Sequence, residues 1–188
     1  MLAALASALA AREPSTAAHC TRVTLLAEGV AVWLGWDERR LRALRLGGPV
    51  HDLGKVMISP EILRKRGPLE PAEIAEIQKH PAAGARLIGP IWPAQEALPF
   101  VLYHHERWDG TGYPTGRSGI DIPEEARVLA VADAFDAMTS MRPYRRAFPV
   151  STAVTEIERC AGSQFDPMVA NAFLQCWHAG ALQHAVAS

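Results

Sequence analysis

The sequence of 188 residues contains few cysteines and no excess of charge of either sign. Its three cysteines, Cys20, Cys160 and Cys176, form no CxxC pair, which argues against a disulfide framework or a structural zinc ribbon. Nineteen basic and twenty acidic side chains give a formal net charge of −1, whereas a protein that coats DNA or RNA polymers needs a basic excess. These absences favour a chain that folds in a reducing compartment.

Long apolar runs are also absent. No apolar stretch reaches the roughly 18 residues that a membrane-spanning helix needs, so we expect no membrane span. The first eleven residues are apolar, but no Lys or Arg precedes them, as a secretory signal would require. Leu2, Leu5 and Leu9 instead follow helical spacing and predict an amphipathic helix over 1–12. This helix begins the domain or links it to an upstream domain.

Hydrophobic residues make up 49% and charged residues 21% of the chain, which is typical of an ordered globular domain. Apolar residues recur at helical spacing nearly throughout, as with Val23, Leu26 and Val30, and no segment alternates convincingly as a strand. We therefore predict one all-α domain over 1–188. The expected helices cover about 14–34, 37–54, 70–79, 82–88, 94–105, 124–140, 151–160 and 166–178.

One long irregular stretch, residues 107–122, interrupts this helical pattern. Its four glycines, Gly110, Gly112, Gly116 and Gly119, indicate a loop. Loops of this length inside a compact domain are usually functional. We therefore expect this Gly-rich loop to belong to the functional site.

Five of the seven histidines and two aspartates lie at helix ends or on predicted inward faces. Burying adjacent imidazoles is costly unless a partner satisfies them, and a metal ion does so. A carboxylate within the apolar stretch 131–135 also needs a partner. The candidate metal ligands are His19, His51, Asp52, His80, His104, His105 and Asp133.

Seven nitrogen and oxygen ligands are too many for one ion and suit two ions that share a carboxylate. Such pairs, roughly 3.5–4 Å apart, are widely used to cut phosphate esters. A set of His and carboxylate ligands without a thiolate favours Fe, Mn, Ni, Co or Zn, and the sequence does not choose among them.

The motifs resemble those of the HD-GYP family within the HD superfamily. The resemblance spans about 10–177 and implies an all-α HD-superfamily bundle of about seven helices with a Gly-rich GYP loop. The matching segments are His19, 51–55 (HDLGK), 80–81 (HP), 104–114 (HHERWDGTGYP), 131–133 (VAD), 142–145 (RPYR) and 164–167 (QFDP).

The family hydrolyses the bacterial second messenger cyclic di-GMP to linear pGpG, and some members continue to GMP. The resemblance implies that this chain does the same with a hydroxide activated by two divalent metal ions, Fe or Mn in the first place, with Ni, Co or Zn as alternatives. It also implies the ligand sets, with Asp52 bridging both ions. His19, His51, Asp52 and Asp133 would hold one ion, and His80, His104 and His105 the other.

The resemblance also suggests residues that act on the substrate. Lys55 would stabilise negative charge on the scissile phosphate, and Arg142 and Arg145 would bind the phosphates bidentately. Each of these three has the alternative of being an ordinary surface residue. Tyr113 would contact a guanine, or its loop would contact diguanylate cyclase (GGDEF) domains. Some members use a Glu four residues before the first ligand to bind a third metal; Ser15 stands there, which predicts two metals and weakly favours pGpG as the end product.

Two other functions remain open. The chain would hydrolyse a different cyclic dinucleotide, such as cyclic GMP-AMP, or pGpG; alternatively, it would be a catalytically weak signalling module that binds diguanylate cyclase domains. The intact set of ligands argues against the weak module. The resemblance places the protein in the bacterial cytoplasm, where it would bind cyclic di-GMP, and a homodimer is a further expectation.

Overall fold

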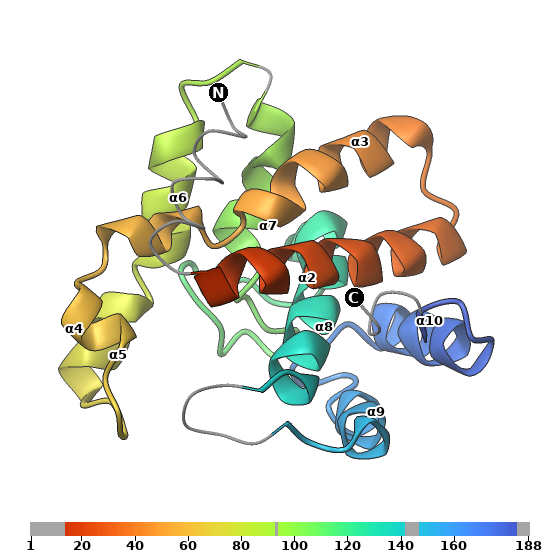
Figure 1. The fold of residues 1–188 in the computed structure, drawn as a ribbon. Helices are drawn as coiled ribbons and strands as arrows, with labels where there is room; N and C mark the ends of the chain where they lie inside the picture. The colour runs from red at the N-terminus through yellow and green to blue at the C-terminus, as the bar shows by residue number, and fades with distance from the viewer. Residues whose placement is uncertain (1–13, 93, 142–146, 184–188) are drawn as a thin grey trace.

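The computed structural model describes residues 14–92, 94–141 and 147–183, with side chains from Thr16 onward, and shows a helical protein (Figure 1). Within these ranges the chain forms helices and loops and no β-strand, apart from an isolated bridge between Ala161 and Phe165. The predicted all-α class is therefore confirmed. The predicted helix over 1–12 lies outside the described residues.

Helices α2 (Pro14–Trp33) and α8 (Glu124–Thr139) cross at the centre of the fold (Figure 1). The predicted stripe of Val23, Leu26 and Val30 on α2 is at most 1% exposed, because α8 and its neighbours cover it. The same core includes side chains from α3 (Glu38–Gly47), α9 (Val150–Arg159) and α10 (Pro167–His178). Two central helices thus carry the main hydrophobic core.

A second, smaller core holds the segments around residues 48–57. It contains Val50, Leu53, Ile88 and Val101. The segments that contribute are the 3-10 helices η1 (Gly48–Val50), η2 (Leu53–Met57) and η3 (Ala94–Ala97), together with α6 (His80–Ile88) and α7 (Leu98–Tyr103). Between η2 and α6, the chain forms α4 (Pro60–Leu63) and α5 (Pro71–Ile77), and η4 (Gly119–Asp121) lies in the Gly-rich loop.

Prolines shorten two of the predicted helices. The helix expected over 37–54 ends at Gly47, because Pro49 has no N–H to continue the ladder and the chain tightens into η1. The helix expected over 94–105 is divided into η3 and α7. Pro99 lies in the first turn of α7, a position that proline favours because its missing N–H would be unpaired there in any case. The predicted Asp166 cap is present, since its side chain accepts a hydrogen bond from the backbone N–H of Met168.

The contact between η2 and α6 is closer than most side chains permit. A Cβ atom on Gly54 would lie 1.8 Å from the carbonyl oxygen of His80 and 2.6 Å from the backbone nitrogen of Gly84. Only glycine fits there, and its absence of a side chain brings the HDLGK segment against the start of α6. This contact joins two segments that carry predicted metal ligands.

None of the helices within the described ranges has both the length and the apolar character that a bilayer crossing requires.

Candidate metal centre

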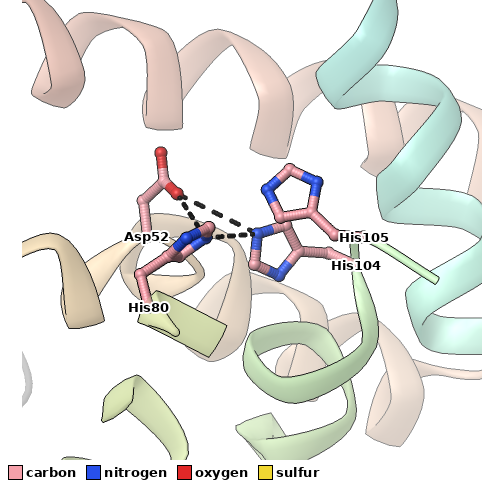
Figure 2. Close-up of side chains that lie close together, drawn as sticks. All are labelled: Asp52, His80, His104 and His105. Carbon is pink, nitrogen blue, oxygen red and sulfur yellow. Dashed lines mark hydrogen bonds and ion pairs between the residues drawn. The ribbon is translucent and has the colours of Figure 1, made fainter. Parts of the chain in front are cut away.

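The structure gathers all seven predicted ligands into two neighbouring groups of side chains. Asp52, His80, His104 and His105 form one group, and Figure 2 shows these side chains beside one another. His19, His51 and Asp133 form the other, and in each group the potential ligand atoms lie within 4.8 Å of one another. Residues up to 114 positions apart in the sequence therefore converge, as the predicted site requires.

Asp52 lies between the two groups. Its Oδ1 lies 3.2 Å from Nε2 of His80 and 3.9 Å from Nε2 of His104. Its Oδ2 lies 3.7 Å from Nε2 of His51, which belongs to the other group. One carboxylate therefore faces both sets, which is the arrangement that a bridging ligand needs.

Three of the histidines are oriented by the same local device. His51 and His104 directly follow η1 and α7, and His80 follows the end of α5 by three residues, at the start of α6. In each case a backbone carbonyl three residues earlier accepts a hydrogen bond from Nδ1–H. A carbonyl oxygen only accepts, so Nδ1 carries the hydrogen, and in the neutral imidazole that binds metal, Nε2 keeps its lone pair. The pairs are His51 with Gly48 at 2.7 Å, His80 with Ile77 at 2.8 Å and His104 with Val101 at 3.1 Å.

The freed nitrogen atoms fit a cation. Nε2 of His80 and Nε2 of His104 lie 3.3 Å apart, and in these tautomers neither has a hydrogen to donate. Nε2 of His51 is buried and has no hydrogen-bond partner among the residues that the structure describes. Buried lone pairs that face one another without a hydrogen are unfavourable, and a metal ion bound between them removes that cost. The donor set therefore fits divalent metal ions.

Electrostatics favour a neutral imidazole at His104 and His105 and an ionised carboxylate at Asp52. Burial, and then the neighbouring imidazoles, hold the pKa of His104 well below its usual value, and burial lowers the pKa of His105 to about 4. Burial alone would raise the pKa of Asp52, but the charges of Lys55 and His51 hold it well below its usual value. At His51, burial opposes the charged form, but interactions with Cys20 and Asp52 outweigh burial and raise the pKa to about 9. Neutral imidazoles and an ionised carboxylate are the forms that bind metal.

His19 differs from His51, His80 and His104 because it lies in the interior of a helix, α2. Its Nε2 lies 3.1 Å from Asp133 and its Nδ1 lies 2.7 Å from Asp136, both on α8. Burial opposes the protonated form, but hydrogen bonds with the two carboxylates outweigh burial and raise the pKa of His19 to about 9. Sequence reasoning did not single out Asp136. Its only signal was a second aspartate one turn beyond Asp133 in the same apolar helix.

Cys20, which follows His19 in α2, is buried. Its sulfur also lies within 4.8 Å of ligand atoms of His51 and Asp52. A thiol therefore lies close to the predicted His and carboxylate donors, and the predicted ligand set does not include it. The position after His19 in a helix gave no sign that its side chain would reach the HDLGK segment.

A buried carboxylate holds the Gly-rich loop against the site. Glu106 is 4% exposed and accepts hydrogen bonds from the N–H of Thr115 at 2.7 Å, its hydroxyl at 2.6 Å and the N–H of Arg117 at 3.1 Å. The loop also approaches closely at Gly112, where a Cβ atom would lie 2.4 Å from the backbone nitrogen of Arg107. Glu106 stood within the motif, but its role depends on contacts that sequence does not reveal.

Two of the four residues predicted to contact the substrate, Tyr113 and Lys55, lie beside the proposed metal ligands. The Tyr113 ring stacks on His105, with ring centroids 4.8 Å apart, so it lies beside the metal ligands. The Lys55 ammonium lies 2.6 Å from Oδ2 of Asp52. Arg142 and Arg145 lie outside the described residues.

We expect Glu106→Gln to loosen the loop. The amide loses one acceptor oxygen and turns N–H groups toward backbone N–H donors, which costs about 1–3 kcal/mol in the free energy of unfolding. Chemical denaturation and amide hydrogen exchange at Thr115 and Arg117 measure the effect. Glu156→Gln, on an exposed ion pair with Arg159, is the control and should change stability by well under about 1 kcal/mol. Equal effects of the two variants would contradict this role for Glu106.

Comparison with known proteins places these residues in a family. The HD domain family model matches residues 3–169. A cyclic di-GMP phosphodiesterase response regulator, RpfG of Xanthomonas campestris, is 38% identical over 93% of this chain and 47% of its own length. A cyclic di-GMP phosphodiesterase of Thermotoga maritima is 39% identical over 87% of this chain and 45% of its own. The 3'3'-cGAMP-specific phosphodiesterase 2 of Vibrio cholerae is 36% identical over 92% of this chain and 34% of its own length.

Solved structures agree on the fold. A cyclic GMP-AMP specific phosphodiesterase of V. cholerae aligns with a TM-score of 0.69 at 18% identity, over 90% of this chain and 46% of that one. The Bdellovibrio bacteriovorus protein Bd1817, described as an HDG"Y"P protein, aligns with a TM-score of 0.69 at 21% identity, over 87% and 52%. The chain spans less than half the length of the curated relatives named here. From the family match, the relatives and the converging ligands, we conclude that this chain belongs to the HD domain family and to its HD-GYP branch.

Proposed function

We propose that this protein is a metal-dependent phosphodiesterase that hydrolyses cyclic di-GMP to linear pGpG. The observation that carries the proposal is the convergence of six other His and Asp side chains around the Asp52 carboxylate. The names of the Xanthomonas and Thermotoga relatives support cyclic di-GMP as the substrate. Fe or Mn is our proposal for the native metals, with Ni, Co and Zn as alternatives.

The residues divide between two ions as follows. His19, His51 and Asp133 would hold one ion; His80, His104 and His105 would hold the other; Asp52 would contact both. Two such ions, when bound, supply a nucleophile from water at neutral pH and stabilise charge on phosphoryl oxygens. The side chain of Ser15 lies outside the described ones, so the expectation of two metals instead of three stays a proposal.

The chain's own residues would position the substrate beside this centre. Tyr113 lies over His105 and would contact a guanine base at the edge of the site. Lys55 would place its ammonium beside the scissile phosphate, where it stabilises developing negative charge. Arg142 and Arg145 would bind phosphate oxygens with their planar guanidinium groups.

Lys55 gives a test of this arrangement. We expect Lys55→Met to lower kcat by about 10²–10³, because one preorganised cation near developing charge contributes about that much. Bound metal should stay at the wild-type amount, since the variant removes a cation and no ligand. Lys65→Met, which breaks an ion pair with Glu73 away from the cluster, is the matched control and should leave kcat unchanged. A kcat for Lys55→Met equal to that of the control would remove Lys55 from the catalytic machinery.

One alternative substrate is supported by a specific observation. Relatives of V. cholerae are named 3'3'-cGAMP-specific phosphodiesterases, at 35–36% identity. The contact of Tyr113 with a guanine would suit either dinucleotide, because both contain guanine. Binding of GGDEF domains through the Gly-rich loop, a homodimer and the bacterial cytoplasm remain our proposals. We also propose a single domain, since the main core joins residues from Val23 to Leu182.

The test is anaerobic incubation of Mn²⁺- or Fe²⁺-loaded protein with cyclic di-GMP, and in parallel with 3'3'-cGAMP, followed by chromatography of the products. We expect cyclic di-GMP to be converted to pGpG at the higher kcat/KM. A higher kcat/KM for 3'3'-cGAMP would establish the alternative substrate. No turnover of either compound by metal-loaded protein would contradict the enzymatic proposal.

A further inference from the structure

His19 is oriented by a different device from three of the other proposed metal ligands. His51, His80 and His104 lie at helix ends and donate Nδ1–H to a backbone carbonyl three residues earlier. His19 lies inside α2, where the carbonyls are engaged by the helix's own N–H groups. The backbone therefore offers His19 no such acceptor, and its orientation depends on another element.

Asp136 on α8 supplies the acceptor. Its Oδ2 lies 2.7 Å from Nδ1 of His19, and the residue is 3% exposed. A carboxylate at Nδ1 leaves Nε2 directed at Asp133, 3.1 Å away, within the second group of ligands. A carboxylate that binds the outer nitrogen of a metal-ligating histidine fixes both ring orientation and tautomer.

Asp136 is itself held in place. Arg22 donates from Nε to Oδ1 at 2.6 Å and from Nη2 to Oδ2 at 3.1 Å, so both carboxylate oxygens are bound. The same guanidinium also donates to the hydroxyl of Ser140 at 2.9 Å. An aspartate bound by a guanidinium and an imidazole keeps one orientation, which a single hydrogen bond would not ensure.

The register of the two central helices explains why these groups meet. His19 and Arg22 lie one turn apart on α2, and Asp133 and Asp136 lie one turn apart on α8. The crossing of these helices therefore forms an inner pair of proposed ligands, His19 and Asp133, and an outer pair, Arg22 and Asp136 (Figure 1).

We propose that Asp136, held by Arg22, is a positioning residue that directs Nε2 of His19 to the metal on the His19, His51 and Asp133 side. This inference rests on the two-metal centre of the proposed function. Asp136 contacts no ligand of the other group in any interaction that the structure records among the described residues. Its effect should therefore be confined to one of the two ions.

The test is calorimetric titration of metal-free protein with Mn²⁺ alone. We expect wild-type protein to bind two ions, and Asp136→Ala to bind one of them about 10–100-fold more weakly while the other keeps its affinity. Asp136→Asn keeps an oxygen that accepts a hydrogen bond from Nδ1–H. Its affinity for that Mn²⁺ ion should lie between those of the wild type and Asp136→Ala. This second variant also serves if the alanine variant does not fold.

Asp166→Ala is a matched control. Asp166 is also 3% exposed and paired with an arginine, Arg127, but it lies at the start of α10 and caps that helix. This variant should lower the melting temperature and leave both Mn²⁺ affinities unchanged. A purely structural role for Asp136 would leave both Mn²⁺ affinities unchanged, as in Asp166→Ala, or would reduce both of them. Either result would overturn the inference.

The ring itself provides a second readout. In ¹⁵N-labelled, Zn²⁺-loaded protein, long-range ¹H–¹⁵N spectra should show His19 with its hydrogen on Nδ1, and Asp136→Ala should lose this single state. Suppose that the wild type binds two ions and that Asp136→Ala keeps both affinities and the His19 tautomer. That result would overturn this inference and leave the proposed metal centre intact. Fewer than two ions in wild type would overturn the metal centre and, with it, the inference.

Discussion

Asp52→Ala should lower turnover of cyclic di-GMP by at least about a thousandfold, which is the largest effect on activity that we expect. The variant removes the one carboxylate, among the residues that the structure describes, that is placed to contact both proposed ions. Such ions, when bound, would lower the pKa of water and so supply the nucleophile. Initial rates with Mn²⁺-loaded protein measure the loss, and the helical circular dichroism spectrum should stay close to that of wild type.

Asp37→Ala is the control for this substitution. Asp37 accepts a hydrogen bond from the N–H of Arg40 at the start of α3 and lies outside both groups of ligands. Its loss should lower the free energy of unfolding by about 0.5–2 kcal/mol. Turnover per folded molecule should stay at the wild-type value. Wild-type turnover by Asp52→Ala would exclude the metal mechanism.

The largest effect on folding should come from Gly54→Ala. The new Cβ atom would lie 1.8 Å from the carbonyl oxygen of His80, and this neighbour is backbone, so no side-chain rotation relieves the contact. Overpacking of a core commonly costs about 1–3 kcal/mol, and we expect Gly54→Ala to cost at least about 3 kcal/mol in the free energy of unfolding. Because η2 must move away from α6, the distance between Asp52 and His80 should also increase.

Urea denaturation measures the first part of this prediction, and Mn²⁺ affinity measures the second. Gly89→Ala is the control, because Gly89 has a helical φ of −53° at the end of α6 and the nearest atom to its Cβ would be the carbonyl oxygen of Ala85 at 3.0 Å. That variant should change stability by less than about 1 kcal/mol. If Gly54→Ala is as stable as Gly89→Ala, the close contact between η2 and α6 is wrong.

The convergence of the seven His and Asp side chains could be predicted because their chemistry is visible in the sequence. Adjacent imidazoles and an aspartate within apolar stretches need a partner wherever the chain folds, and the motif order predicts a metal ion as that partner. Helices α2 and α8 were predictable for a similar reason, since Val23 and Phe135 belong to stripes at helical spacing that only a buried face explains.

The residues that support the ligands were harder to predict because their roles depend on distant contacts. Asp136 and Arg22 meet only through the crossing of two helices, 114 residues apart in the sequence. Glu106 acts through the backbone of a loop whose path has no periodic pattern. The helix boundaries beside Pro49 and Pro99 had a local signal, but apolar spacing continued across both prolines and favoured longer helices.

Metal content per chain is the measurement that tests the central claim most directly. Protein purified without oxygen, loaded with Mn²⁺ or Fe²⁺ and freed of unbound metal should contain two ions per chain by elemental analysis, and Asp52→Ala should contain fewer. A wild-type content near two would agree with two groups of ligands sharing Asp52. A content of one ion or less, or close to three, would contradict the two-metal centre.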